Sequence, residues 1–285
     1  MSTIRLAFSP DSDDLFMFWP LLHARVDTHG YKFEHVRADT ESLNRRALAG
    51  DLDVVAISIA SYPSVARNYL LLPHGGSVGR GYGPVVVARE PAPLDWLRGK
   101  SVAVPGSGTT AYLVLRLLVT EFRPVFVPIQ PYDRVFRALR DGEVDAALLI
   151  HEGRLTYERE GFARVVEIGR AWEELTGGLP LPLGGNAIRR GLGPRTIAEV
   201  SGLLREGIRY SLTHRDELID ELLRAETRAD VGLGRDLLDS YLAMYANDDT
   251  LGYPEDARRA VEELLRRGRA AGYLTDTFAG VDWAP

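Results

Sequence analysis

The sequence contains no cysteine, and this absence excludes three kinds of site. A disulfide framework, a thiolate nucleophile and a zinc site with cysteine ligands all require that residue. Long apolar runs are also missing. The two longest, VVAISIA and AALLI, are far shorter than the roughly 20 residues that cross a bilayer as a helix. We therefore expect no membrane insertion.

Positive charge is scarce as well. The 285 residues carry 34 Lys+Arg against 40 Asp+Glu, which gives a net charge of −6, and only Lys32 and Lys100 are lysines. This balance offers no electrostatic reason to bind nucleic acid or an anionic membrane surface. The hydrophobic content of 45% is sufficient for a buried core and excludes intrinsic disorder. The length suggests about two domains.

The N-terminus differs from a secretory signal. Such a signal has a basic stretch followed by an apolar region of about 7–15 residues. Here a short apolar segment, IRLAF (4–8), leads directly into the acidic segment SPDSDD (9–14). We expect a cytoplasmic protein.

Short apolar segments alternate with helical patterns as far as residue 190. The predicted strands are 4–8, 32–38, 53–58, 70–73, 84–89, 101–106, 125–130, 145–150 and 164–169. Strands separated by helices indicate an α/β fold with mainly parallel sheets. From residue 194 the pattern is helical alone, and Pro254 opens a last amphipathic helix. We expect this helical tail to pack on the first domain.

One sequence pattern occurs twice, about 90 residues apart. Arg46-Ala47-Leu48 precedes Gly50, Asp53 and the strand VVAIS, and Arg137-Ala138-Leu139 precedes Gly142, Asp145 and the strand AALLI. Helix–glycine–strand junctions are common in α/β proteins, so the repeat has an ordinary interpretation. The alternative is two similar lobes, which we place at residues 1–90 with 190–285, and at the inserted segment 91–189. Ligands bind beyond the carboxyl ends of such strands, so Ser58 and His151 would face each other across a cleft.

The acidic segment 9–14 lies before a predicted helix. Its Ser and Asp side chains could cap that helix, contact a ligand or hold a divalent metal. No calcium-binding loop of the Asp-x-Asp-x-Asp-Gly type follows, so a calcium site is unsupported.

Two glycine-rich segments have different interpretations. In GSGTTAY (106–112), Thr109 and Thr110 open a helix after a strand, which makes either an ordinary N-cap or a cradle for a carboxylate or phosphate. No Lys follows, so this is not a P-loop. GGSVGRGYGP (75–84) precedes a strand rather than a helix, so we interpret it as an irregular turn.

His151 follows a buried strand and precedes Glu152. A histidine at such a strand end either bonds a local carbonyl or transfers a proton. The other five histidines lie in polar or loop contexts, and none is paired with an acid at zinc-ligand spacing.

Several segments together resemble a known family. They are SP-x-x-x-D-x-F (9–16), ESLNRRALAG (41–50), GRGYGPVVVAR (79–89), VAVPG-x-x-TTAY (102–112), IHE-x-R-x-TY (150–157) and LPLG (181–184). Their order resembles the futalosine-pathway menaquinone enzymes, which include 1,4-dihydroxy-6-naphthoate synthase and chorismate dehydratase, and the synthase is the more similar. The resemblance implies a two-lobed fold like that of type II periplasmic binding proteins.

The resemblance also implies roles for individual residues. His151 would accept the proton, while Thr109 and Thr110 would bind substrate from one lobe and Ala56-Ile57-Ser58 from the other. Ser9 and Asp14 match the family's first motif. The substrate would be cyclic dehypoxanthine futalosine, a small carboxylate cleaved without a metal or a redox cofactor, by a monomer or homodimer. Its ring would suit Phe16, Trp19 or Tyr82.

The chain departs from the family pattern at two places. The family usually has Cys-Pro-Asn-Asp after Ser-Pro, whereas this chain has Asp11-Ser12-Asp13-Asp14. It also has Ala56 where the family commonly has Lys. Two alternatives therefore stand beside the synthase: chorismate dehydratase, and a protein that binds a small carboxylate without reacting.

Overall fold

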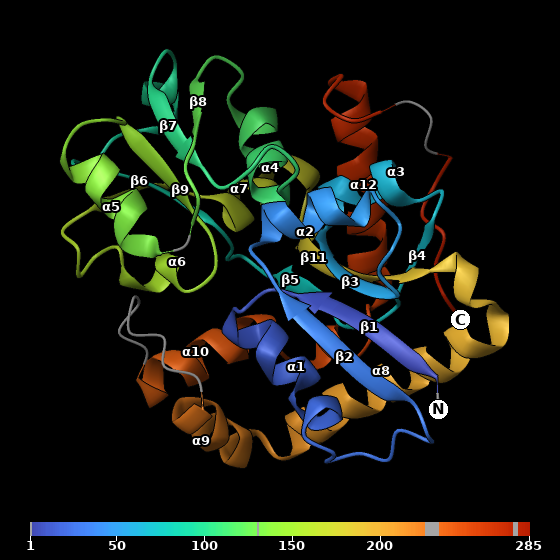
Figure 1. The fold of residues 1–285 in the computed structure, drawn as a ribbon. Coiled ribbons are helices and arrows are strands. Elements are labelled where there is room, and N and C mark those ends of the chain that lie inside the picture. The colour runs from blue at the N-terminus through green and yellow to red at the C-terminus, as the bar shows by residue number, and fades with distance from the viewer. Residues whose placement is uncertain (1, 130, 226–233, 276–278) are drawn as a thin grey trace.

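The chain forms two β-sheets, each flanked by helices and each at the centre of one lobe (Figure 1). This computed structural model describes residues 2–129, 131–225, 234–275 and 279–285. Gln130, at the end of one predicted strand, lies outside the described residues. All nine predicted strands are present, and their ends lie within four residues of the predicted ones.

The first sheet has the order β2-β1-β3-β11-β4, with β5 paired to β11. Its strands are β1 (Thr3–Phe8), β2 (Lys32–Arg37), β3 (Val54–Ser58), β4 (Tyr69–Leu71), β5 (Ser77–Gly79) and β11 (Leu181–Arg189). Strand β1 runs parallel to β2 and β3, whereas β11 runs antiparallel to β3, β4 and β5. Strands β5 and β11 were not predicted from the sequence.

The second sheet has the order β10-β6-β9-β7-β8. Its strands are β6 (Val85–Ala88), β7 (Ser101–Val104), β8 (Arg123–Phe126), β9 (Ala146–Leu149) and β10 (Ala163–Glu167). Strand β7 is parallel to β8 and β9, but β6 is antiparallel to β9 and β10. Both sheets are therefore mixed rather than mainly parallel. Strands β6 and β11 enter their sheets from the other lobe, without the helical crossover that makes neighbouring strands parallel.

The same two strands cross the expected limits of the lobes. Strand β6 falls within residues 1–90 but pairs in the second sheet, and β11 falls within 91–189 but pairs in the first. The chain passes between the sheets on the segments 80–84 and 177–180, about ten residues earlier than the expected crossovers.

The repeated sequence pattern forms equivalent structures in the two lobes. Gly50 and Gly142 both adopt left-handed backbone conformations, with φ of 70° and 76°. Asp53 accepts the Arg5 backbone N–H at 2.9 Å, and Asp145 accepts the Ser101 backbone N–H at 2.8 Å. Each carboxylate thus ties its strand to the first parallel strand of its own lobe, and the lobes are similar at this point.

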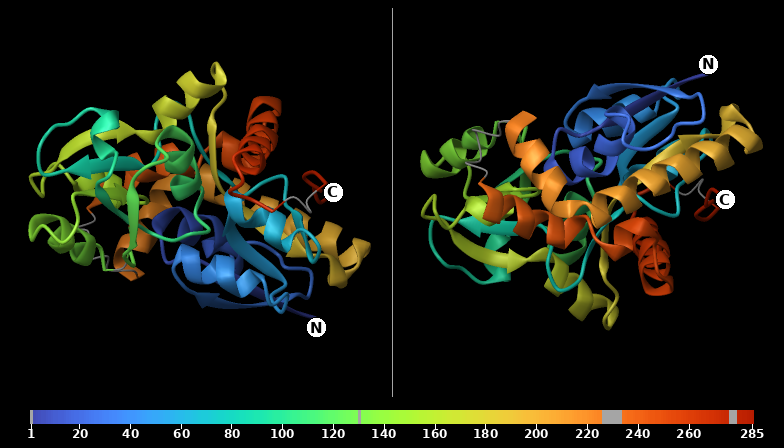
Figure 2. Two further views of the ribbon diagram at one scale, coloured as in Figure 1. Left: turned by 90° about the horizontal axis from the view of Figure 1, so that it is seen from above. Right: turned by 90° about the horizontal axis from the view of Figure 1, so that it is seen from below.

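Helices cover both sheets. The longer ones are α1 (Ser12–Leu22), α2 (Thr40–Ala47), α4 (Thr110–Leu118), α5 (Tyr132–Arg140), α7 (Ile168–Thr176), α8 (Pro194–Thr213), α9 (Arg215–Ala225), α10 (Arg235–Tyr245) and α12 (Glu255–Ala270). Single turns form α3 (Tyr62–Val65), α6 (Gly153–Thr156) and α11 (Asp248–Leu251). Helix α8 packs along α1, and α12 packs on β11 (Figure 2). The predicted packing of the helical tail on the first lobe is confirmed, and α12 also contacts α4 of the second lobe.

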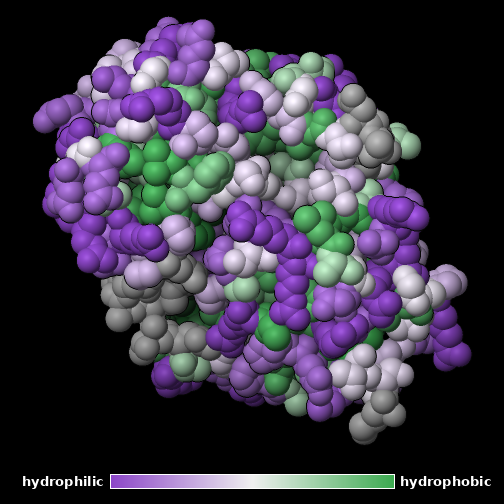
Figure 3. Space-filling model, turned by 45° about the horizontal axis from the view of Figure 1, so that its top comes forward, coloured by the Kyte–Doolittle hydropathy of each residue, from purple (hydrophilic) through white to green (hydrophobic). Residues whose placement is uncertain are grey.

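The surface is predominantly polar. On the face in Figure 3, hydrophilic residues form most of the surface, and apolar residues gather in smaller areas between them. Among the residues that the structure describes, the large apolar side chains with the greatest exposure are Leu48 and Phe126, at 55% and 53%. Among the described residues, no helix is long and apolar enough to cross a membrane.

Candidate active site

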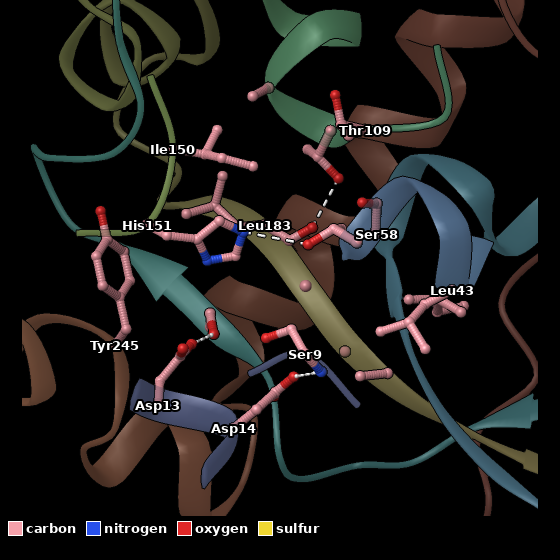
Figure 4. A pocket seen from close by; sticks show the side chains of 18 of the residues that line it. Ser9, Asp13, Asp14, Leu43, Ser58, Thr109, Ile150, His151, Leu183 and Tyr245 are labelled. Atoms are coloured by element: carbon pink, nitrogen blue, oxygen red, sulfur yellow. Dashed lines mark hydrogen bonds between the residues drawn. The ribbon is translucent and has the colours of Figure 1, made fainter. Parts of the chain in front are cut away.

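A pocket of about 740 Å³ lies between the two lobes. Eight of the residues expected at the site line it, namely Ser9, Asp14, Ala56, Ile57, Ser58, Thr109, Thr110 and His151. Ser58 ends β3 in the first lobe and His151 follows β9 in the second, and both side chains line this pocket (Figure 4). The described residues of the lining include no lysine or arginine.

His151 has an unusual backbone conformation. Its φ is +52°, in the left-handed region that non-glycine residues rarely adopt. The alternative that its ring bonds a local carbonyl is wrong, since the ring contacts side chains. Nε2 lies 3.1 Å from the Thr40 hydroxyl of α2, and Nδ1 lies 3.2 Å from an Asp11 carboxylate oxygen. Both partners belong to the first lobe, so the imidazole bridges the pocket.

The acidic segment folds into the floor of the pocket. Asp14 accepts the Ser9 backbone N–H at 2.8 Å, and Asp13 accepts the hydroxyls of Ser77 at 2.9 Å and Tyr241 at 3.1 Å. Burial raises the pKa of Asp13, with His151 opposing and Asp11 adding to the shift. Burial, and then the charge of Asp13, raises the pKa of Asp14 well above its ordinary value. The carboxyls of the pocket floor therefore lose their protons at a higher pH than exposed carboxyls do.

Capping of α1 does not occur as the sequence suggested. The Asp11 side chain makes no capping bond at the start of the helix. Instead Glu152, fully buried in the second lobe, accepts the Ser12 backbone N–H at 3.0 Å and the Ser12 hydroxyl at 2.6 Å. This bond joins the lobes beside the pocket. No group of three or more His, Cys, Asp or Glu side chains that could hold a metal occurs among the described residues.

The two threonines begin α4 at the wall of the pocket. Thr109 is the N-cap, and its hydroxyl oxygen accepts the Tyr112 backbone N–H at 3.4 Å. The Thr110 hydroxyl donates to the Leu183 carbonyl at 2.7 Å and accepts the Ala60 N–H at 3.1 Å. The ordinary N-cap is therefore present. The first amides of α4 also lie at this wall, where helix amides have no partner within the helix and favour an anion.

Ser58 is held by a side chain of α2. Its backbone N–H donates to the Asn44 carbonyl oxygen at 2.8 Å, and its hydroxyl oxygen accepts from the Asn44 amide at 3.1 Å. Both residues are buried. The Ser58 hydroxyl is consequently fixed in place opposite His151 (Figure 4).

The aromatic residues of the pocket differ from those expected. Phe16 and Trp19 are buried in the core of the first lobe, away from the lining, because the face of α1 that carries them packs on α8. Tyr82 donates to the Met244 carbonyl and also lies outside the lining. Tyr241 and Tyr245 of α10 line the pocket instead. Their spacing of four residues places them on one face of a helix, but nothing in the sequence indicates which cavity that face meets.

The fold defines the class of protein first. The alkanesulfonate-binding protein SsuA from Xanthomonas axonopodis pv. citri has a TM-score of 0.72, over 98% of this chain and 96% of that one, at 15% identity. This likeness concerns the fold alone. The chain is thus a two-lobed protein with the periplasmic-binding-protein-like fold.

Closer similarities define the family. The model of a family described as menaquinone biosynthesis matches residues 4–270. The 1,4-dihydroxy-6-naphthoate synthase of Thermus thermophilus is 42% identical over 95% of this chain and 96% of its own. The synthase of Streptomyces coelicolor is 36% identical, over 95% of each chain. Protein AF1704 from Archaeoglobus fulgidus has a TM-score of 0.88 at 42% identity, over 95% of this chain and 98% of that one.

The chain therefore belongs to the menaquinone biosynthesis family. It is an enzyme similar to 1,4-dihydroxy-6-naphthoate synthases.

Proposed function

We propose that this enzyme converts cyclic dehypoxanthine futalosine to 1,4-dihydroxy-6-naphthoate in the cytoplasm, with His151 as the general base. The observation that carries the proposal is the position of the His151 ring, which lies at the wall of the interlobe pocket with Nε2 beside the Thr40 hydroxyl. A base must lie within hydrogen-bond reach of the proton that it removes, and this ring can meet a substrate in the pocket. The names of the two curated relatives support the product.

Substrate binding in this proposal uses both lobes. The first amides of α4, next to Thr109 and Thr110, are suited to the substrate carboxylate, because a helix N-terminus favours negative charge. The Ser58 hydroxyl and the strand end Ala56-Ile57 contact the substrate from the opposite wall. Tyr241 and Tyr245 offer aromatic surface to its ring.

The acidic floor is compatible with an anionic substrate. Asp13 and Asp14 would repel a carboxylate if both were ionised. Burial raises the pKa of each carboxyl and so reduces the repulsion that an anionic substrate would meet. With no lysine or arginine in the described lining, attraction comes from the helix amides and hydroxyl groups.

The chemistry begins with proton transfer. His151 removes a proton from the bound substrate and becomes an imidazolium. The electron pair left behind breaks a carbon–carbon or carbon–oxygen bond, the leaving group departs with that bonding pair and takes the proton back from the imidazolium, and aromatisation of the product drives release. The hydrogen bonds from Ser12 to Glu152, beside the pocket, hold the two walls together while Nε2 of His151 exchanges the Thr40 hydroxyl for the substrate. Such closure excludes water from the reacting groups.

Turnover of cyclic dehypoxanthine futalosine, compared with chorismate and a panel of small carboxylates, tests the proposal. Purified enzyme is incubated with cyclic dehypoxanthine futalosine, and the product is detected by mass spectrometry. We expect 1,4-dihydroxy-6-naphthoate from the wild type and from His214→Asn, a control at the exposed end of α8, but none from His151→Asn. Chorismate and a panel of small carboxylates serve as the other substrates. Dehydration of chorismate, or tight binding of a carboxylate with no reaction on any compound, would overturn the proposal.

A further inference from the structure

Asp11 is the member of the acidic segment that contacts the histidine directly. Its carboxylate is fully buried, and one oxygen lies 3.2 Å from Nδ1 of His151. The main chain at Asp11 is fixed on both sides, since its N–H donates to the Ser9 hydroxyl and its carbonyl accepts the Leu15 N–H at 3.0 Å. It is also the N-cap residue of α1, where the helix dipole favours negative charge. The carboxylate is therefore preorganised.

A second oxygen approaches the same ring nitrogen. The Tyr241 hydroxyl lies 3.4 Å from Nδ1 of His151 and donates its proton to Asp13 at 3.1 Å. Burial holds the pKa of Tyr241 well above its ordinary value, so the phenol keeps that proton. Because the proton points to Asp13, the phenol oxygen faces the ring as an acceptor. Nδ1 thus has the Asp11 carboxylate oxygen at 3.2 Å and the phenol oxygen at 3.4 Å, and two acceptors at these distances favour a hydrogen on Nδ1.

The tautomer of the neutral ring follows from this arrangement. If Nδ1 carries the hydrogen, the lone pair is on Nε2. That nitrogen faces the Thr40 hydroxyl, a donor at the wall of the pocket. The nitrogen that can accept a proton is consequently the one that a substrate can reach.

We propose that Asp11 is a positioning residue, which holds His151 in the Nδ1–H tautomer and directs the basic Nε2 into the pocket. The inference rests on the proposed role of His151 as base. The arrangement is the Asp–His pairing of many hydrolases, in which the carboxylate orients the imidazole and stabilises the imidazolium. The left-handed backbone sets the position of the His151 Cβ, and the Asp11 carboxylate sets the rotation of the imidazole ring.

The test combines a spectroscopic with a kinetic measurement on the full chain. Nitrogen NMR of protein with labelled histidines, with the His151 signals assigned from His151→Asn, distinguishes the two neutral tautomers. We expect Nδ1–H in the wild type. In Asp11→Asn the carboxamide can present its NH₂ to Nδ1, so we expect the Nε2–H form. We also expect kcat to fall about 10²–10⁴-fold while KM changes little.

Two further variants complete the test. Asp11→Ser removes the carboxylate without adding bulk, so it should show a mixed tautomer and the same loss of kcat if Asp11→Asn does not fold. Asp53→Asn is the matched control, a buried carboxylate bonded to Arg189 at 2.6 Å and remote from the pocket. It should lose stability but keep the tautomer and kcat of the folded enzyme.

The outcomes separate this inference from the proposed function. If His151→Asn abolishes turnover while both Asp11 variants keep the Nδ1–H tautomer and kcat within about threefold of wild type, the positioning role of Asp11 is wrong and the base is not. If His151→Asn retains turnover, the proposed base is wrong, and the role of Asp11 in catalysis is overturned with it. The NMR result then decides whether Asp11 orients the ring.

Discussion

Glu152 is a buried charge that joins the two lobes, and its removal should destabilise the protein strongly. The carboxylate is fully buried and accepts two hydrogen bonds, from the Ser12 backbone N–H at 3.0 Å and the Ser12 hydroxyl at 2.6 Å. Hydrogen bonds to a charged group contribute about 1.5–3 kcal/mol each. Glu152→Ala removes both and leaves two buried donors without this acceptor. We expect the free energy of unfolding to fall by about 3–5 kcal/mol.

The assay is urea unfolding followed by circular dichroism, with linear extrapolation to water. Glu152→Gln keeps an acceptor oxygen and loses the charge, so it should cost about 1–2 kcal/mol. Glu160→Ala is the matched control, because this nearby glutamate is half-exposed and pairs with Arg140 at 2.8 Å on the surface. Such a pair contributes at most about 1 kcal/mol. If Glu152→Ala were no more destabilising than Glu160→Ala, the assignment of Glu152 as the bond between the lobes would be wrong.

Three further perturbations follow from the structure. Burial, and then the charge of Arg205, lowers the pKa of His74 from 6.5 to about 4. Between these two pH values the unfolded chain binds a proton that the folded chain does not. The free energy of unfolding should therefore rise with pH across this window. Urea titrations at pH 4.5 and 7 should differ by about 2–3 kcal/mol more in the wild type than in His74→Gln, and equal differences would refute this. At Gly169 a Cβ would lie 2.0 Å from the Tyr82 carbonyl oxygen, so Gly169→Ala should lower the melting temperature, whereas Gly202→Ala, with open space around it in α8, should raise it slightly. Thr110→Val removes a hydroxyl that bonds Leu183 and Ala60 across the lobes, so it should raise KM and cost about 1–3 kcal/mol of stability. Thr110→Ser keeps the hydroxyl and should cost less. A Val variant as stable as the Ser variant would contradict the role of this hydroxyl.

Most of the strands that the sequence predicted are short apolar segments between turn residues, so the local pattern suffices for them. Strand β2 is the exception, since Lys32–Arg37 is largely charged and exposed. Strand β11 was missed because Leu181–Arg189 contains two adjacent glycines and a proline, which are typical of turns. It nevertheless forms the centre of the first sheet, because its neighbours β3, β4 and β5 supply the pairing. That stabilisation comes from residues more than 100 positions away and has no local signal.

The pocket was predictable where it depends on strand ends. Ser58 and His151 follow equivalent strands in two similar lobes, and the repeated Gly and Asp residues reveal that equivalence. Tyr241 and Tyr245 could not be predicted, because α10 reaches the pocket only through its packing on α1 and β5. The partner of Glu152 lies 140 residues away, across the lobes. The left-handed backbone at His151 was likewise not predictable, since even histidine adopts this conformation in only a small fraction of cases.

The central claim is that His151 performs the proton transfer, and a single-turnover experiment tests it most directly. Excess enzyme is mixed with limiting cyclic dehypoxanthine futalosine, so that the observed rate reports the chemical step rather than product release. Asparagine tolerates the left-handed backbone of this site, so His151→Asn should fold and bind the substrate with an affinity within a few-fold of wild type. We expect its single-turnover rate to fall about 10²–10⁴-fold. A rate equal to that of the wild type, with the substrate bound, would contradict the account.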